Sequence, residues 1–279
     1  MNHAVFCPRR FARLACQYGR EHGRGWAITL LVLGVVLALL AVLVMAVSSG
    51  RGATTAAQVT IYYLGLFLSG YLVAHRLHGA WRAREAALVY LMRPASVFEK
   101  WLLSALLALV AWPLLYSAVF ALVYGVAGHV SYNLAVTAHT VLESVGDRFS
   151  SPPDPQDYAL YLPLRVLTEI SAPSLMAQAM LALTYAALMG YAAATLTWFR
   201  RHAGLRALIL LIALGMLTLL LLALLGNTNW NGVLFDQWLN RPTRSLPLAA
   251  RLLPVAFWLG IPALLWLASW RTLLERELT

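Results

Sequence analysis

Residues 26–48 read WAITLLVLGVVLALLAVLVMAVS and contain no Asp, Glu, Lys or Arg. A run of this length reaches the about 20 residues that an α-helix needs to cross the hydrocarbon core of a bilayer. Because backbone groups in lipid must satisfy their own hydrogen bonds, the run is expected to be helical. It therefore predicts a membrane-spanning helix, and it sets the class of fold for the whole chain.

Five further apolar blocks have the same character. They lie at about 59–74, 101–127, 174–199, 207–225 and 252–270, and none contains a charged Asp, Glu, Lys or Arg. Only 11% of the 279 residues are charged, whereas a soluble domain has about a quarter. The blocks predict an all-α polytopic membrane protein with six transmembrane helices, forming one domain over residues 26–279.

Positive charge is concentrated on alternate connections between the blocks. Of the 21 Lys and Arg residues, 15 lie before the first block, between the second and third, between the fourth and fifth, or after the sixth. Basic connections stay in the cytoplasm, so both termini are expected there, in a bacterial inner membrane. We interpret the net charge of +10 as an orientation signal, and no nucleic-acid partner is expected.

Residues 1–25 predict a separate basic segment before the first block. The segment has apolar residues at helical spacing and five arginines: Phe6, Phe11, Leu14 and Tyr18, with Arg9, Arg10, Arg13, Arg20 and Arg24. Such a pattern is typical of an amphipathic helix that lies at the membrane surface, with lipid as its partner. We expect an interfacial cytoplasmic helix here.

The connection 75–100 reads HRLHGAWRAREAALVYLMRPASVFEK and is predicted to lie in the cytoplasm. Pro94 disfavours helix in the residue before it. Ser96 and Glu99 then have the Ser-x-x-Glu spacing of a capping box, in which each side chain binds the other residue's backbone N–H. Two interpretations stay open, a helix start at the interface with no further role and a contact site for a cytoplasmic partner.

Residues 91–100, LMRPASVFEK, resemble the LPxSRxE segment of ABC-2 type transporter permeases, which lies between the second and third transmembrane helices. Pro94, Ser96 and Glu99 match this pattern, whereas Arg93 and Val97 depart from it. The resemblance also covers six helices, cytoplasmic termini and an amphipathic helix before the first span. It implies that 75–100 is a coupling loop whose contacts to an ATPase subunit are Arg82, Arg84, Glu85, Pro94, Ser96, Glu99 and Lys100.

The resemblance implies a transport subunit, most simply an exporter, that is not itself an enzyme. The sequence has no Gly-x-x-x-x-Gly-Lys-Ser/Thr motif, so a P-loop ATP site is not expected in this chain. ATP would be bound by a separate ATP-binding subunit, and the chain itself is expected to hold no cofactor. Two permease subunits, identical or different, are expected to form a pair.

Two other classes of function remain as alternatives, a membrane scaffold or assembly factor and an intramembrane enzyme. His75 and His78 are three residues apart, and His129, His139 and Glu143 invite a metal interpretation. However, no His-Glu-x-x-His helix is present, as an integral metalloprotease would need. We therefore expect no metal site.

The blocks contain weakly polar residues that are candidates for a translocation path: Tyr62, Tyr71, Gln178, Thr184 and Tyr191. Hydrogen bonding between helices would explain them equally well. Gly65 and Gly70 are expected to allow close helix approach. The Trp112-Pro113 pair is expected to distort the third helix.

The connection 128–173 is the longest, and we expect it to be an outer loop. Apolar residues within 130–145 and 158–170 suggest two interfacial helices, which could either cover a pore or pack on the bundle. The segment SSPPDPQD at 150–157 is expected to separate them, because its three prolines cannot form a regular helix.

Overall fold

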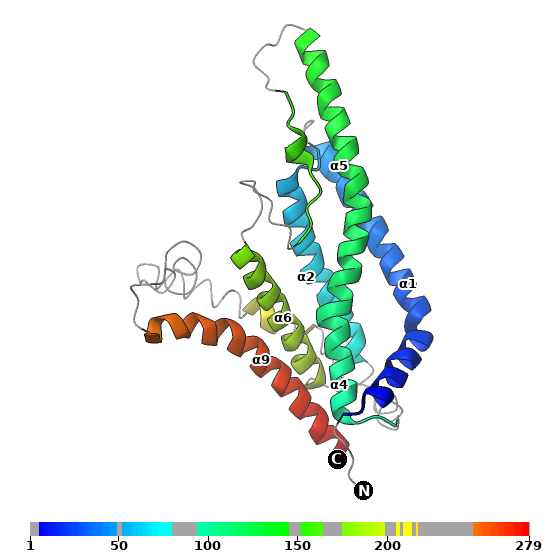
Figure 1. Cartoon of the computed structure of the whole chain (residues 1–279), viewed down its shortest axis with the longest axis vertical. Helices are drawn as coiled ribbons and strands as arrows, with labels where there is room; N and C mark the ends of the chain where they lie inside the picture. Colours follow the sequence, from blue (N-terminus) through cyan, green and yellow to red (C-terminus); the bar gives the residue numbers. More distant parts are fainter. Residues whose placement is uncertain are drawn as a thin grey trace. The chain divides into compact units, whose positions relative to one another are not determined.

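The computed structural model describes residues 6–48, 52–79, 94–144, 152–163, 175–198, 205–206, 209–213, 216 and 248–278. Every regular element in these ranges is helical (Figure 1). The α-helices are α1 (Pro8–Val47), α2 (Thr55–Gly79), α4 (Val97–Leu106), α5 (Trp112–Ser144), α6 (Leu175–Trp198) and α9 (Leu248–Leu278). A π-helical turn, η1 (Leu107–Ala111), joins α4 to α5, and a 3-10 turn, η2 (Pro155–Tyr158), follows α5.

Five helical stretches are long and apolar enough to cross a membrane. They contain the predicted blocks 26–48, 59–74, 101–127, 174–199 and 252–270, at least in large part. The all-α prediction for a membrane protein is confirmed at this level. Most of the block 207–225 lies outside the described residues, so the sixth span stays a prediction.

The N-terminal basic residues belong to the same helix as the first apolar block. Helix α1 runs without a break for 40 residues, whereas the sequence predicted a separate interfacial helix over 1–25. The glycines at 19 and 23 do not interrupt it, since one glycine costs a helix only about 1 kcal/mol. The helical prediction for this segment is confirmed from Pro8 onward.

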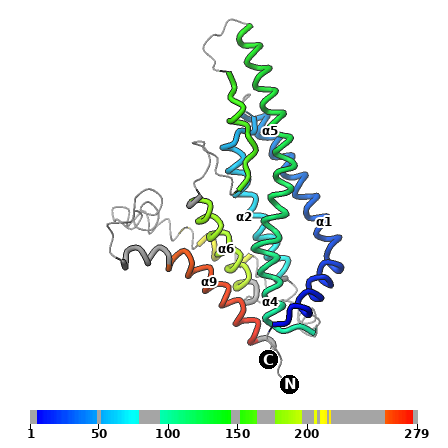
Figure 2. The backbone as a smooth tube through the Cα atoms, viewed as in Figure 1, coloured from blue at the N-terminus to red at the C-terminus, as the bar shows by residue number. Residues whose placement is uncertain are grey.

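Helices α4 and α5 form one run of 48 residues, Val97–Ser144, which Figure 2 shows as a continuous tube. At 1.5 Å per residue this run is about 72 Å long, far more than the about 30 Å of a hydrocarbon core. Residues 128–144, predicted to belong to an outer loop, are therefore a continuation of the span. Their helical character was predicted, but their continuity with the span was not.

The π-helical turn η1 ends directly before Trp112-Pro113. Proline has no backbone N–H and its ring crowds the preceding turn, so the regular hydrogen-bond pattern cannot pass through Pro113. A π turn is one way in which a helix absorbs this disturbance. The predicted distortion is confirmed, and its form is a π turn.

Residues 152–163 do not contain the second predicted helix. After the 3-10 turn η2 the backbone becomes extended, with φ −60° and ψ 141° at Ala159. No helix is present from 159 to 163, and 164–170 lie outside the described residues. The prediction of an interfacial helix starting at Tyr158 was wrong, because Tyr161 is used to anchor the segment to α2, as described below.

The chain divides into two compact units. The first contains Met1–Leu14, Ser69–Leu109 and Ala179–Thr279, and the second contains Ala15–Leu68 and Val110–Gln178. In the first unit, α4 packs against α9 through Val97 and Leu273, and the Trp101 indole N–H donates to Ser269 Oγ at 3.0 Å. These contacts place the beginning of α4 in a packed environment.

The second unit is built around tyrosines of α2 and α5. Tyr62 makes edge-to-face contacts with Tyr116, Phe120 and Tyr161, with ring centroids 5.1–5.5 Å apart. Gly65 leaves the space that the Tyr116 hydroxyl occupies. The predicted role of Gly65 in close helix approach is thus confirmed.

Candidate functional site

The candidate site begins at the capping box that starts α4. Ser96 Oγ accepts the backbone N–H of Glu99 at 3.2 Å, and the Ser96 N–H donates to Glu99 Oε2 at 3.1 Å. Both halves of the predicted box are present. Because the first N–H groups of a helix have no partner within it, this box both ends the preceding loop and begins the helix.

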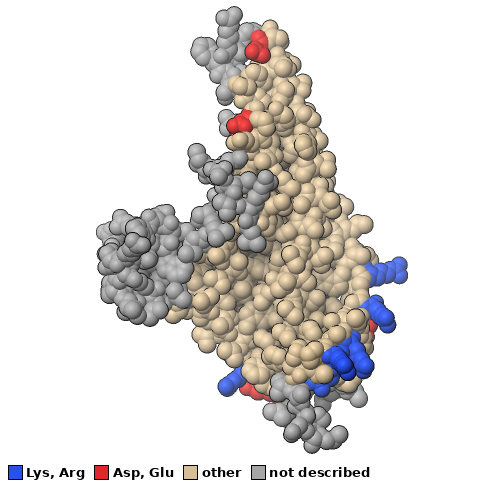
Figure 3. Space-filling view, viewed as in Figure 1, with Lys and Arg blue, Asp and Glu red and all other residues tan. Residues whose placement is uncertain are grey.

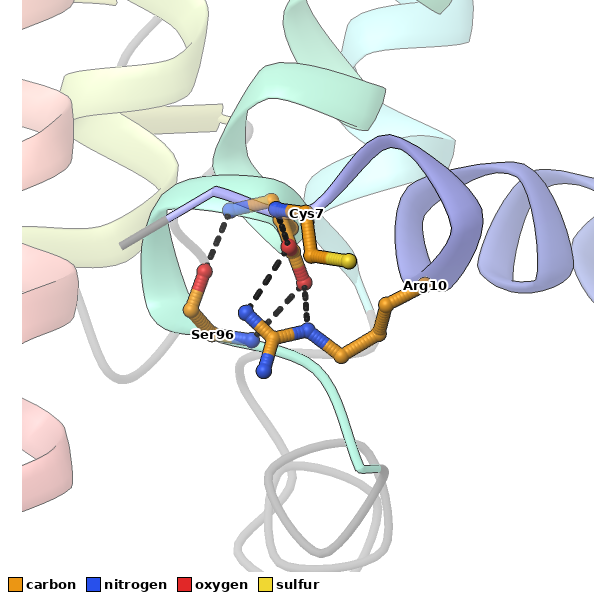
Figure 4. A network of polar contacts seen from close by, with 4 residues as sticks. Cys7, Arg10 and Ser96 are labelled. Carbon is orange, nitrogen blue, oxygen red and sulfur yellow. Dashed lines mark hydrogen bonds and ion pairs between the residues drawn. The ribbon is translucent and has the colours of Figure 1, made fainter. Parts of the chain in front are cut away.

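The Glu99 carboxylate has further partners in the N-terminal segment. Arg10 donates from Nε to Oε2 at 2.7 Å and from Nη2 to Oε1 at 2.9 Å. The Cys7 backbone N–H donates to Oε1 at 2.8 Å. Figure 4 shows Cys7, Arg10 and Ser96 converging on this carboxylate. We call these four residues the Glu99 cluster.

The Glu99 cluster is closed from solvent at the carboxylate and open at the guanidinium. Glu99 is 0% exposed, whereas the Arg10 side chain is 32% exposed. A Phe6–Phe98 edge contact at 6.3 Å lies in the same region. A buried carboxylate is tolerated only where its oxygens are paired, and four donors meet that need here.

The electrostatics of Glu99, which precedes the apolar run 101–127, follow from these contacts. Arg10 donates two hydrogen bonds to the carboxylate, the Cys7 and Ser96 N–H groups donate one each, and all four favour its charged form. The side chain is therefore ionised at neutral pH. A permanent charge and fixed donors make this group a structural clamp and a poor general acid or base.

Of the residues predicted to contact an ATPase subunit, some lie in the described part of the chain and others do not. Glu99 and Lys100 are buried, Ser96 is half-buried and Pro94 is exposed. The structure brings these four together at the beginning of α4, while Arg82, Arg84 and Glu85 lie outside the described residues. The Glu99 carboxylate accepts hydrogen bonds from Arg10, Cys7 and Ser96 of the same chain, and its contact with another subunit stays a prediction.

Cys7 and Arg10 were missed as partners of Glu99 by the sequence analysis. Arg10 was noted only as one of five basic residues, and it lies 89 positions from Glu99. No local pattern indicates such a pairing. The one available signal was that Glu99 needs a partner if it is buried, and burial is a tertiary property.

The five candidate path residues are divided between the two units. Tyr62 and Gln178 are buried in the second unit, and the Tyr62 hydroxyl is 2.7 Å from Ser117 Oγ. Thr184, in the first unit, is exposed and donates to Met180 O of its own helix at 2.8 Å. Tyr71 and Tyr191 are half-buried in the same unit. Packing between helices accounts for Tyr62, and a hydrogen bond within its own helix accounts for the hydroxyl of Thr184.

Within the first unit, the π turn has a specific polar contact. The Tyr185 hydroxyl donates to Ala108 O of η1 at 2.9 Å, and both residues are buried. Gly70 lies against this ring, since a Cβ there would be 2.6 Å from Tyr185 Cε2. The tyrosine thus satisfies a carbonyl that the π turn leaves available.

The described residues contain no group of three His, Cys, Asp or Glu side chains that could hold a metal ion. His78 is buried and its Nδ1 is 2.8 Å from Ala74 O, one turn earlier in α2. Comparison with protein-family models, curated proteins and solved structures finds no significant match to this chain.

Proposed function

We propose that this chain is the permease subunit of an ABC-2 type exporter in a bacterial inner membrane, with both termini in the cytoplasm. A separate ATP-binding subunit supplies the energy, and two permease subunits form the transport path. The proposal is carried by one observation. Ser96, two residues after Pro94, and Glu99 of the permease-like segment form a capping box that fixes the start of α4.

The anchoring supports a coupling role because it ties the end of the loop to two helices, α4 and α1. The carboxylate that caps α4 also binds Cys7 and Arg10, immediately before and within the first turns of α1. A force applied to the loop before Pro94 would therefore reach α4 and the start of α1 together. Alternating access needs such a connection between ATPase closure and the movement of membrane helices.

The burial of Glu99 and Lys100 divides the predicted contact residues by role. Residues with buried side chains support the end of the loop. We assign the direct contact to the charged residues Arg82, Arg84 and Glu85, together with Pro94, which is exposed. In this proposal the loop docks and the Glu99 cluster transmits the docking force.

Co-purification from the native membrane in mild detergent tests the proposal. We expect an ATP-binding protein to accompany the wild-type chain and to be lost from R82E/R84E. A matched control is R271E, which reverses an exposed charge near the end of α9, outside the loop. Thermal unfolding of each purified variant checks that the fold is retained.

The results discriminate between the classes of function. Loss of the ATP-binding protein from R82E/R84E alone supports docking at the loop. Recovery of a different partner that depends on the same arginines would favour a membrane scaffold. If no ATP-binding protein accompanies the wild type while the complex is otherwise intact, the permease proposal is wrong.

A further inference from the structure

One face of α1 carries arginines at one end and apolar side chains along the rest. With 3.6 residues per turn, Arg20, Arg24, Leu31, Val35 and Val42 fall within an arc of about 60°. All five are exposed, and Leu31, Val35 and Val42 are 68%, 52% and 62% exposed. They lie in the part of α1 that belongs to the second unit. We call them the lipid-side stripe.

The opposite side of the same helix is the protein side. Leu37 and Ala41 are 1% and 3% exposed, and they lie about 90–130° around the helix from the middle of the lipid-side stripe. A large exposed apolar surface on a membrane-spanning helix is expected to face acyl chains. The arginines of the stripe therefore project on the side from which lipid approaches.

With the uncharged block 26–48 in the hydrocarbon core, the two arginines fall at the height of lipid headgroups. Arg24 comes two residues before the apolar block, and Arg20 one turn earlier. Figure 3 shows Lys and Arg side chains projecting from the N-terminal part of α1. Among the described residues, no hydrogen bond or ion pair occupies either guanidinium. Their donors are thus available to an anionic partner, and a guanidinium matches phosphate with two parallel hydrogen bonds.

We propose that the lipid-side stripe binds an anionic diacyl phospholipid, with its phosphate at Arg20 and Arg24 and its acyl chains along Leu31 and Val35. Basic positions that continue into an exposed apolar face of the same helix match a ligand with an anionic headgroup and acyl chains. The proposal does not depend on transport. It names the lipid class that this end of α1 selects.

Measuring lipid binding by the purified full chain tests whether the lipid-side stripe selects an anionic phospholipid. Native mass spectrometry compares phosphatidylglycerol with phosphatidylcholine of the same acyl chains. We expect the wild type to prefer phosphatidylglycerol, and R20Q/R24Q to bind it about fivefold more weakly per lost arginine, roughly 25-fold in all. Binding of phosphatidylcholine should be unchanged. The preference should also weaken with added salt.

A variant that moves the two arginines to another side of α1 tests whether their position or the net charge decides lipid binding. In R20Q/R24Q/G19R/G23R the charge is unchanged, but the arginines move to the angular positions of Leu37 and Ala41. Both glycines have open space where a Cβ would be, and G19Q/G23Q controls for the loss of glycine. We expect the relocated arginines to leave the preference for phosphatidylglycerol as weak as in R20Q/R24Q.

Three outcomes would overturn the proposal. The relocated variant could recover the wild-type preference, which would mean that total charge decides it. R20Q/R24Q could keep the preference, which would place the lipid elsewhere. Inorganic phosphate could displace phosphatidylglycerol at equal concentration, which would show a phosphate site without acyl-chain contact.

Discussion

Arg10 and Glu99 lie 89 residues apart in the sequence, and two hydrogen bonds of 2.7 and 2.9 Å join their side chains. The pair resembles an ordinary ion pair, but the carboxylate also accepts the N–H groups of Cys7 and Ser96. Two backbone donors thus point at the same position. The Glu99 carboxylate is therefore the acceptor for two backbone N–H groups as well as for the Arg10 side chain.

The first prediction follows from these backbone donors. The charge swap R10E/E99R should fail to restore the stability that R10E and E99R each lose. In the swapped chain the N–H groups of half-buried Cys7 and Ser96 would face a guanidinium, which accepts no hydrogen bond. E99R removes the acceptor of both N–H groups, and the double variant should be no more stable than E99R. Thermal unfolding in detergent measures this.

A control for the swap is S96A, which removes the helix cap and leaves the Arg10–Glu99 pair in place. It should cost about 1 kcal/mol. Recovery of R10E/E99R to within the error of the wild type would show that the ion pair alone matters and that the backbone donors contribute little.

The second prediction concerns Gly70. An alanine Cβ at this position would lie 2.6 Å from Tyr185 Cε2, so G70A should displace the ring and break its bond to Ala108 O. Overpacking of this kind costs about 1–3 kcal/mol. Y185F should cost about 1 kcal/mol, because only the hydrogen bond is lost. Thermal unfolding midpoints of G70A and Y185F show whether G70A is the more destabilised of the two.

G260A is the matched glycine control in the same unit, since open space surrounds its Cβ position. It should be neutral or stabilising. A destabilisation of G260A equal to that of G70A would mean that the contact with Tyr185 is not the cause.

The third prediction concerns the anchoring of the segment 152–163. Gln58 is fully buried, its amide N–H donates to Ala53 O at 3.0 Å, and its Oε1 accepts the Tyr161 N–H at 3.0 Å. Q58L leaves two buried backbone groups unpaired, at about 1–3 kcal/mol each. The amide of Tyr161 should then exchange at least about tenfold faster. Hydrogen exchange with mass spectrometry measures it.

T60V provides the comparison for Q58L. The Thr60 hydroxyl is exposed and bonds to Ala56 O of its own helix, at 3.2 Å. Exchange of Tyr161 should not change in this variant. If Q58L also leaves the exchange unchanged, other contacts, such as those of the Thr55 hydroxyl with the carbonyls of 156–159, hold the segment.

The fourth prediction concerns Gly52, whose φ of +60° lies in the left-handed region. A Cβ there would be 2.5 Å from Ser131 Cβ, and Ser131 Oγ accepts the Ala53 N–H at 2.9 Å. G52A should therefore cost more than the about 1 kcal/mol of a strained backbone alone. Thermal unfolding of G52A beside G125A, whose Cβ would meet open space, measures the difference.

Prediction from the sequence succeeded where the deciding interactions are local. The Ser96–Glu99 box, the distortion before Pro113 and the close approach at Gly65 and Gly70 all depend on residues near in sequence or on the size of a single side chain. It failed at Tyr158–Tyr161. The apolar spacing there predicted a helix, but the contacts of Tyr161 with Gln58 and Tyr63 select an extended backbone.

The sequence by itself determined that this is a helical membrane protein, because long uncharged runs leave the backbone no other way to satisfy its hydrogen bonds in lipid. It also determined where α4 begins. Only the tertiary structure decided that α1 is continuous and that Glu99 is closed by Cys7 and Arg10. The physical reason is that burial creates the need for a partner, and folding decides which distant residue meets it.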